Sequence, residues 1–435
     1  MPDHEDARCP AADPVPTGSR GLQGPRADRT SADDRRNPGP PGLTTPGRLI
    51  GVDATRGLAL LGMMAVHSLW AYDDDGEVTW HYALAAGQSA ATFALLAGLG
   101  IAFMTGRRRV RRGEWRGTAA SLAARAGVIA AVGLFLGWTD AGLATVILVY
   151  YAVLFLLAIP VVLLSTRALF AVGTAIAVVV PVLSHLVRPA LPEASGGNIG
   201  LGQVFTDPLG LLLELTVTGL YPALPWMAYI CIGIAIGRLR LSEHRVAVRL
   251  LAIGSAAAVG AWALSTLLLK ALGGESRLYS TAAQSGLSQT DVSDLLVFGS
   301  GGTTPTGTWW WLATTAPHTS TPLDLFHTLG VSAALLGGML LLARPAGKLL
   351  LPIAAAGGMT LTLYTAHILF INSPLDVFSA TSGYLVQLVA VLAFAVAWRM
   401  AMGRGPLEQL AADAARGARR TVRGRAEAPT DTSTP

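Results

Sequence analysis

Long apolar runs, separated by short polar segments, recur between residues 48 and 402 of the chain. A stretch of about 18 or more apolar residues is long enough to cross a lipid bilayer as a helix. We therefore predict an all-α, polytopic membrane helical bundle of about ten transmembrane helices. The predicted spans are residues 48–70, 84–105, 119–138, 144–163, 168–187, 222–240, 247–269, 324–343, 349–371 and 384–402.

The composition agrees with a chain whose solvent is a lipid bilayer. Hydrophobic residues make up 52% of it and charged residues only 14%, against about 25% charged in an average soluble domain. This balance excludes an ordinary soluble enzyme. The net charge of +5 is mainly a topology signal, so we expect no nucleic-acid partner. The two cysteines, Cys9 in a polar segment and Cys231 in an apolar run, do not suggest a disulfide framework.

The basic residues of the loops predict the orientation of the spans. If the N-terminus is cytoplasmic, the outer loops hold only Arg188, Lys270 and Arg277. Because cytoplasmic loops are enriched in basic residues, this bias predicts a multi-pass plasma-membrane protein with both termini inside. The inner loops would then hold 13 basic residues: Arg107, Arg108, Arg109, Arg111, Arg112, Arg116, Arg167, Arg238, Arg240, Arg245, Arg249, Arg344 and Lys348.

Polar composition marks the two ends of the chain. Residues 1–47 are rich in Pro, Gly, Arg and Asp without apolar periodicity, so we predict a disordered cytoplasmic tail. Residues 404–435 are predicted to form a basic cytoplasmic tail, either loose or lying on the membrane surface. The membrane domain is therefore expected to cover residues 48–403.

Two outer loops are long, at about residues 188–221 and 270–323. The second contains Trp309, Trp310 and Trp311, whose indole rings favour the headgroup region, so this loop is either a lid or a membrane-anchored linker. Residues 209–219 are apolar but too short to cross, which indicates an interfacial or re-entrant segment.

The first predicted span carries charged and titratable residues on one face. Asp53 and Arg56 are three residues apart and therefore neighbours on a helix. The eleven residues from Arg56 to His67 make almost three turns, so both side chains point the same way about 16 Å apart. Ionisable groups in a span are costly, which favours a functional role such as substrate binding. The alternatives are a structural ion pair for Asp53 and Arg56, and an interfacial histidine for His67.

The ninth predicted span carries a second polar stripe. Thr360, Tyr364 and His367 follow the i, i+4, i+7 spacing of one helix face. With the predicted topology, His367 lies at a depth similar to that of His67, so the two could face one cavity from opposite walls. Either imidazole could then act as a general base, or both could be hydrogen-bonded core residues.

The remaining motifs argue against a metal or nucleotide site. Neither HExxH nor CxxC occurs, and the glycine-rich segments of the second outer loop lack the GK[ST] of a phosphate loop. We predict no metal and no bound cofactor. His81, His318 and His327 lie in or next to outer loops, where a single histidine is usually a surface residue.

Four motifs occur together in the sequence. They are Arg48-x4-Asp53-x2-Arg56-Gly57-Leu58-Ala59-x-Leu61-Gly62, the stretch from Ala91 to Gly98, Tyr221-Pro222-Ala223-Leu224-Pro225-Trp226 followed by Gly233-x3-Gly237-Arg238-Leu239, and Gly405-Pro406-Leu407-Glu408. Together they resemble bacterial members of the heparan-α-glucosaminide N-acetyltransferase catalytic-domain family, and the resemblance covers roughly residues 47–410.

The resemblance implies a transmembrane acyltransferase. Its co-substrate would be acetyl-CoA or another acyl-CoA from the cytoplasm, and its acceptor an extracytoplasmic, glycan-like amine or hydroxyl of the cell envelope. His81 is the nearest match to the family's histidine in the first outer loop. The catalytic candidates are thus His67, favoured by the residue pattern, His81, favoured by the resemblance, and His367. The substrate-binding candidates are Asp53, Arg56, Thr360 and Tyr364.

Two other functions fit the same residues. In a transporter or permease, Asp53, Arg56 and the histidines would form a proton or substrate path. The third alternative is a non-catalytic envelope membrane protein of the same fold. A homo-oligomer is compatible with all three.

Overall fold

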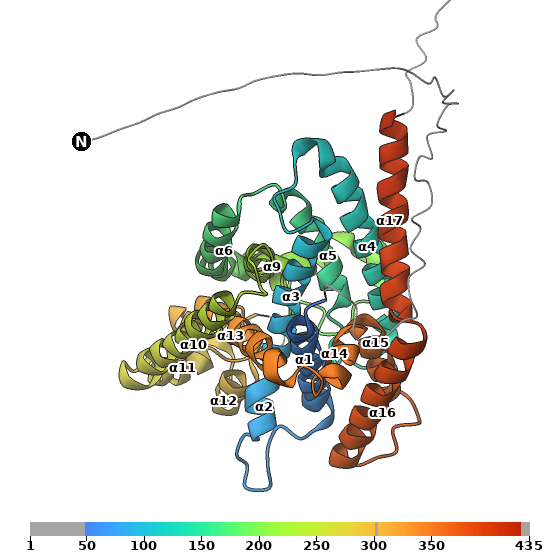
Figure 1. Ribbon diagram of the computed structural model, residues 1–435. Helices are drawn as coiled ribbons and strands as arrows, with labels where there is room; N and C mark the ends of the chain where they lie inside the picture. The colour runs from blue at the N-terminus through green and yellow to red at the C-terminus, as the bar shows by residue number, and fades with distance from the viewer. Residues whose placement is uncertain (1–47, 301–302, 428–435) are drawn as a thin grey trace, which may run out of the picture. The chain divides into compact units, whose positions relative to one another are not determined.

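The computed structural model describes residues 48–300 and 303–427, and this part of the chain is helical (Figure 1). It contains no β-strand, only an isolated antiparallel bridge between Tyr72 and Val78. Its α-helices are α1 (Ile50–Ser68), α2 (Trp80–Ala85), α3 (Gln88–Met104), α4 (Trp115–Phe135), α5 (Leu148–Val161), α6 (Thr166–Val187), α7 (Leu201–Thr206), α8 (Pro208–Leu213), α9 (Ala223–Gly237), α10 (His244–Thr266), α11 (Gly274–Ala282), α12 (Gln289–Phe298), α13 (Pro322–Ala346), α14 (Leu351–Gly357), α15 (Thr360–Ile371), α16 (Ala380–Ala401) and α17 (Pro406–Glu427).

The chain is a helical membrane protein with six to eight candidate spans in the described residues. Two of the eight are bent pairs: Pro208–Thr218 with Ala223–Gly237, at 52°, and Leu351–Gly357 with Thr360–Ile371, at 82°. The predicted number of ten is not confirmed. The six unbroken segments are Trp80–Met104, Arg112–Trp138, Thr166–Ala190, His244–Ala271, Pro322–Ala346 and Ala380–Ala401.

Two of the ten predicted spans, residues 48–70 and 144–163, are not among the six to eight candidate membrane spans. Helix α1 contains Asp53, Arg56 and His67, which lower its mean hydropathy. Helix α5 has 14 residues, or about 21 Å of helix, which is shorter than the ~30 Å hydrocarbon core of a bilayer. Residues 209–218 lie in α8 and in the π-helical segment Glu214–Thr218, and Gly219 follows this segment. The 52° bend comes directly after it, as in a broken or re-entrant segment.

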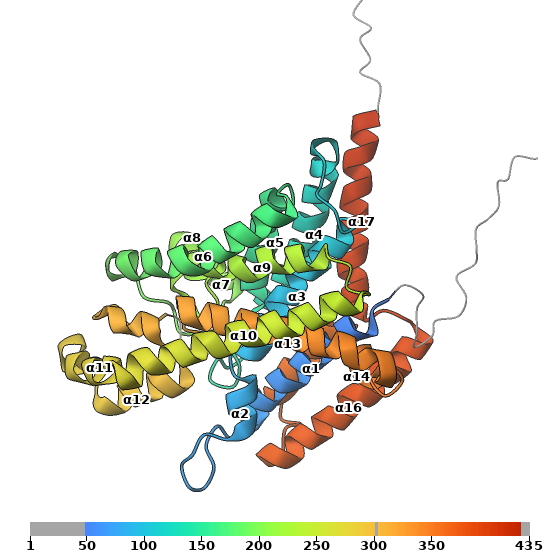
Figure 2. The same ribbon diagram turned by 60° about the vertical axis from the view of Figure 1, so that its left-hand side comes forward.

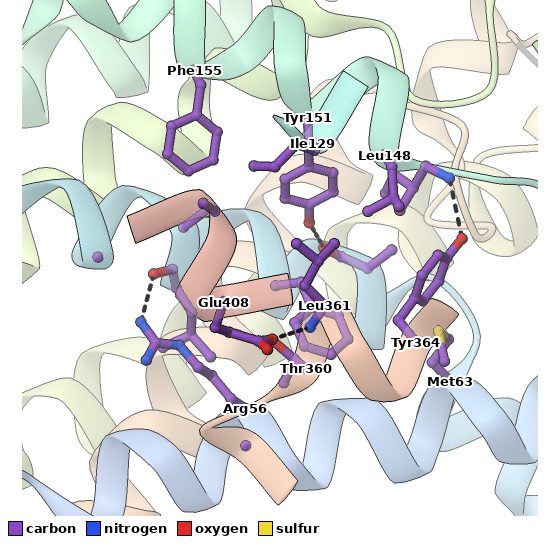
Figure 3. Close-up of a pocket in the computed structure, with 18 of the residues that line it drawn as sticks. Arg56, Met63, Ile129, Leu148, Tyr151, Phe155, Thr360, Leu361, Tyr364 and Glu408 are labelled. Atoms are coloured by element: carbon purple, nitrogen blue, oxygen red, sulfur yellow. Dashed lines mark hydrogen bonds between the residues drawn. The ribbon is translucent and has the colours of Figure 1, made fainter. Parts of the chain in front are cut away.

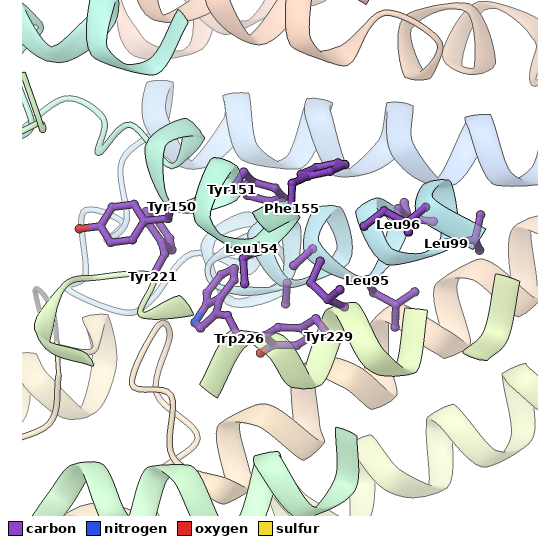
Figure 4. Packing of buried hydrophobic residues seen from close by; sticks show 14 of the residues in the cluster. Leu95, Leu96, Leu99, Tyr150, Tyr151, Leu154, Phe155, Tyr221, Trp226 and Tyr229 are labelled. Carbon is purple, nitrogen blue, oxygen red and sulfur yellow. The ribbon is translucent and has the colours of Figure 1, made fainter. Parts of the chain in front are cut away.

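Helices α3, α5 and α9 form the centre of the apolar core (Figure 4). Gly98 of α3 faces Gly233 of α9, and a Cβ at either position would clash with the backbone of the other helix. Small residues at a crossing allow two membrane helices to pack backbone to backbone. The aromatic rings of Trp226 and Tyr229 fill the space beside this crossing, edge to face, with centroids 5.1 Å apart.

Helix α1 packs against α3, α13 and α14. At its crossing with α14, Gly57 and Gly357 leave no room for a Cβ, because each lies against the backbone of the opposite helix. Gly357 and Gly358 also end α14, and the chain turns by 82° before α15 begins. Helix α10 runs beside α13, and α17 lies along α4 (Figure 2). The segment predicted as a basic tail thus begins with a helix packed on the bundle.

Candidate functional site

A cavity of about 270 Å³ lies between α1, α3, α4, α5, α15 and α17. Most of its wall is apolar, with Phe93, Leu148 and Phe155 among the lining side chains. Its charged and titratable lining residues mark two ends. Arg56 and Glu408 lie at one end and Tyr364 at the other (Figure 3). We call these the arginine end, which also includes Arg125, and the histidine end, which includes His67.

Asp53 and Arg56 interact as the sequence predicts. Arg56 donates from Nη1 to Oδ1 of Asp53 over 3.4 Å and from Nη2 to the carbonyl oxygen of Leu96 over 3.3 Å. Asp53 is only 5% exposed and also accepts a hydrogen bond from Nε of Arg48. One buried carboxylate therefore holds two guanidinium groups in place, while their role in binding a substrate stays a prediction.

Arg56 also lines a second cavity of about 540 Å³. Arg48, Asp53 and Arg107 line it as well. The guanidinium of Arg107 lies 4.5 Å from the ring centroid of Phe103, which is a cation–π contact. Three arginines and a single carboxylate face this cavity, so it favours an anionic ligand, and Arg56 stands between it and the first cavity.

Glu408 and Arg125 complete the arginine end. Oε1 of Glu408 accepts hydrogen bonds from the backbone N–H groups of Leu361 and Thr362, and Oε2 accepts from the Thr362 hydroxyl. Glu408 thus caps the free N–H groups that begin α15 and complements the positive end of that helix. Arg125 has a buried Nε without a hydrogen-bond partner among the described residues. Its charge adds to the attraction for an anion.

The histidine end contains a chain of hydrogen bonds through three helices. Nδ1 of His67 lies 3.1 Å from Nε2 of His367, and the two rings are nearly parallel, at 7°. Nδ1 of His367 lies 2.6 Å from Oε1 of Gln387. Nε2 of Gln387 donates to the Ser68 hydroxyl over 3.4 Å. His67 lines the cavity, whereas His367 lies behind it and is only 2% exposed. Because their ring nitrogens are 3.1 Å apart, the two histidines are in direct contact and not on opposite walls of the cavity.

The other predicted site residues divide into two groups. Thr360 and Tyr364 line the cavity, and the Tyr364 hydroxyl accepts a hydrogen bond from the backbone N–H of Ile147 over 3.4 Å. His81 lies on α2, 3.4 Å from the Thr79 hydroxyl, and is not among the residues that line this cavity. Its predicted catalytic role therefore has no geometric support from the cavity.

His318 and His327 are not simple surface residues. The ring of His318 packs edge to face on Tyr221, a cavity residue, with centroids 5.1 Å apart, and its Nδ1 is buried. Burial lowers the pKa of His318 to about 4, because an imidazolium loses its hydration there. Nδ1 of His327 is 3.0 Å from the carbonyl oxygen of Ala258, so this nitrogen donates.

Sequence reasoning missed several polar residues of the site. Arg125 and Gln387 are single polar residues within apolar segments, and that isolation is the signal that could have identified them. Glu408 belongs to a motif that we quoted, but its cavity contact depends on the bend before α15. In residues 48–300 and 303–427, no group of three or more His, Cys, Asp or Glu side chains could hold a metal ion.

Comparison with known proteins gives one match. A family model described as "Heparan-alpha-glucosaminide N-acetyltransferase, catalytic" matches residues 48–271, which is 224 of the 435 residues. No curated protein matches the chain. The matched region includes Asp53, Arg56 and His67, whereas His367 and Glu408 lie beyond it.

Proposed function

Since this chain belongs to the heparan-α-glucosaminide N-acetyltransferase catalytic family, which is a family of membrane acyltransferases, we propose that it transfers an acyl group from acyl-CoA to a glycan-like acceptor. The donor would be acetyl-CoA or a related thioester, bound from the cytoplasm. The acceptor would be an amine or hydroxyl on the outer side of the plasma membrane. The observation that supports this proposal is a single cavity with arginines at one end and hydrogen-bonded histidines at the other.

The arginines suit the phosphate groups of the donor. A guanidinium can bind two phosphate oxygens at once, and here Arg48, Arg56 and Arg107 face one cavity. Arg56 lines this cavity and the apolar one beyond it. The phosphates would stay with the three arginines, while the narrower acyl-carrying arm would extend past Arg56 between Phe93 and Phe155 toward His67.

The histidine end supplies a proton acceptor for the transfer. His67 would take the proton from the acceptor's N–H or O–H as the acceptor atom attacks the thioester carbonyl carbon. The new C–N or C–O bond forms, the C–S bond breaks, and the electron pair leaves with sulfur. The imidazolium of His67 then returns the proton to the thiolate, so the products are the acylated acceptor and free CoA-SH.

One observation favours a permease as the second candidate. Many transporters bind substrate where a membrane helix is interrupted, and α14 and α15 meet at an 82° bend beside this cavity. In a permease, Arg56 and the histidines would line a path for protons or substrate and would not form a reaction site. The two candidates differ in one measurable property, because only the acyltransferase consumes the thioester.

The test is acyl transfer by the purified full chain in lipid nanodiscs. Radiolabelled acetyl-CoA is supplied with glucosamine-terminated oligosaccharides, and both labelled product and free CoA thiol are measured. We expect CoA release that depends on the oligosaccharide and matches the labelled product. Donor binding without CoA release for any amine or hydroxyl acceptor would contradict the proposal. Uptake of the same oligosaccharides into proteoliposomes would then favour the permease.

A further inference from the structure

We propose that Gln387 and His367 are positioning residues that fix the tautomer of His67, so that Nε2 of His67 is the unprotonated nitrogen facing the cavity. This inference rests on the proposed acyl transfer and deepens it, because it names the atom that takes the proton. Neither Gln387 nor His367 lies in the region matched by the family model. The inference depends on three hydrogen bonds and on where each donor proton must lie.

The donor-to-acceptor direction of these hydrogen bonds is set by Gln387, a buried polar residue in the apolar helix α16. Its amide nitrogen donates to the Ser68 hydroxyl over 3.4 Å, which leaves the amide oxygen for His367 at 2.6 Å. An amide oxygen can only accept hydrogen bonds. The proton between Gln387 and His367 must therefore belong to Nδ1 of His367.

The same reasoning fixes the next hydrogen bond. A neutral imidazole carries one proton, so a His367 protonated on Nδ1 has an unprotonated Nε2 that can only accept. That Nε2 lies 3.1 Å from Nδ1 of His67. Nδ1 of His67 must therefore carry a proton and donate a hydrogen bond to Nε2 of His367.

The consequence appears at the cavity wall. With its proton on Nδ1, His67 has an unprotonated Nε2, and no hydrogen-bond partner for this atom occurs in the described part of the chain. His67 is the member of the chain that lines the cavity. An unprotonated imidazole nitrogen facing a substrate cavity is what a general base requires, and a second hydrogen-bonded group commonly sets that tautomer.

The donor and acceptor roles in these hydrogen bonds would reverse if the side-chain amide of Gln387 were flipped, so that its nitrogen and oxygen exchanged places. Its nitrogen would then donate to Nδ1 of His367, and the protons of both histidines would move to Nε2. An ionised glutamate at this position cannot do so, because a carboxylate only accepts. Gln387→Glu should therefore keep the proton of each histidine on Nδ1, as proposed. Gln387→Leu removes the acceptor that places the proton on Nδ1 of His367.

The first experiment reads the tautomers directly. The full chain is labelled with ¹⁵N-histidine, reconstituted in nanodiscs, and compared with a His67→Asn variant to assign the His67 signals. We expect the Nδ1–H tautomer of His67 in the parent and in Gln387→Glu. In Gln387→Leu we expect a mixture. A parent His67 protonated on Nε2 would overturn the proposal.

The second experiment measures turnover of the same variants at saturating donor. Gln387→Leu should lower kcat by between about 10-fold and 10⁴-fold, the upper value being the cost of the wrong tautomer in a protease triad. Its donor KM should stay unchanged, and Gln387→Glu should keep kcat within about threefold of the parent, well above that loss. The matched control is Tyr384→Phe, which removes another hydrogen bond from α16 to α1, to the Leu61 carbonyl at 3.4 Å.

The two experiments separate this inference from the proposed function. If a parent with the Nδ1–H tautomer transfers no acyl group, the proposed function fails and the tautomer assignment stands. If the parent transfers acyl groups but folded Gln387→Leu keeps full kcat, the positioning role fails and the acyltransferase stands. If Gln387→Leu does not fold, a parent His67 protonated on Nε2, or a loss of kcat in folded Gln387→Glu, would still overturn the proposal.

Discussion

The arginine end and the histidine end of the cavity are built in opposite ways. At the arginine end, Asp53 holds Arg48 and Arg56, and both oxygens of Glu408 are occupied by the start of α15. At the histidine end, His67 is held through neutral hydrogen bonds. The difference indicates two tasks, because fixed positive charge attracts an anion whereas a neutral imidazole can accept a proton.

Both ends depend on α1, but the region matched by the family model contains all the arginines of the arginine end and only part of the histidine end, while Glu408 lies beyond it. The Asp53 and Arg56 pair and the arginines beside it fall in residues 48–271. The histidine end joins His67 of that region to His367 on α15 and Gln387 on α16, which lie beyond the match. We therefore expect the arginines of the arginine end to be shared with other members of the family, and the hydrogen bonds of the histidine end to be more particular to this protein.

The largest effect should follow removal of the base at the histidine end. His67→Ala should lower kcat by about 10²- to 10⁴-fold, the usual contribution of general base catalysis, with little change in donor KM. His81→Ala should stay within about threefold of the parent, far short of that range, because His81 does not line the cavity. Acyl transfer at saturating acetyl-CoA, measured on variants shown to be folded, tests both.

The reverse outcome would change the assignment at that end. A large loss in His81→Ala with full activity in His67→Ala would move the base to α2 and support the position implied by the family resemblance. If neither variant, nor His367→Ala, loses activity, the histidine end does not take part in catalysis, and the permease becomes the better account.

The next largest effect should follow a change at the arginine end, and it should appear in binding. Arg56→Ala should raise the donor KM by about 10- to 150-fold, which corresponds to the 1.5–3 kcal/mol of a hydrogen bond to a charged group. Arg56→Lys should not restore it, because an ammonium cannot bind two oxygens in a plane. Arg240→Ala is the matched control, since Arg240 is exposed and its ion pair within the described residues is with the exposed Glu243. Unchanged acetyl-CoA affinity in Arg56→Ala would remove the donor-binding role.

Sequence reasoning predicted a contact within one helix, whereas for His67 and His367 it gave a similar depth but not their direct contact. The spacing of Asp53 and Arg56 predicts their pairing, since three residues span one turn. The contact of His67 with His367 joins residues 300 positions apart, and no spacing rule gives its distance. Glu408 reaches Leu361 because the chain bends by 82° at Gly357 and Gly358, whereas a hydropathy window records only that the segment is apolar.

A smaller effect should come from His318, a neutral histidine near the histidine end but outside its hydrogen-bonded chain. Its folded pKa of about 4 lies below the 6.5 of an exposed imidazole. The unfolded chain therefore binds more protons between these values, and the free energy of unfolding falls as the pH drops from 6.5 toward 4. His318→Gln should remove about 1.4 kcal/mol of the loss between pH 7.5 and 5.5. Unfolding in detergent at both pH values measures it, and equal losses in parent and variant would contradict the assignment.

The smallest effect should come from Glu408→Gln, which tests whether the charge at the start of α15 matters beyond its hydrogen bonds. The amide oxygen of glutamine can still accept from the backbone N–H of Leu361, but the negative charge at the helix N-terminus is lost. The variant should therefore lose about 0.3–1 kcal/mol of stability.

Removing a negative charge near Arg56 and Arg125 should also make the arginine end more positive, so the donor KM should fall slightly while kcat is unchanged. Glu408→Ala, which removes the hydrogen bonds as well, should cost about 0.5–2 kcal/mol. Equal losses of stability in the two variants would show that the charge is what α15 requires, and a fall in kcat in both variants would place this carboxylate in the reaction instead.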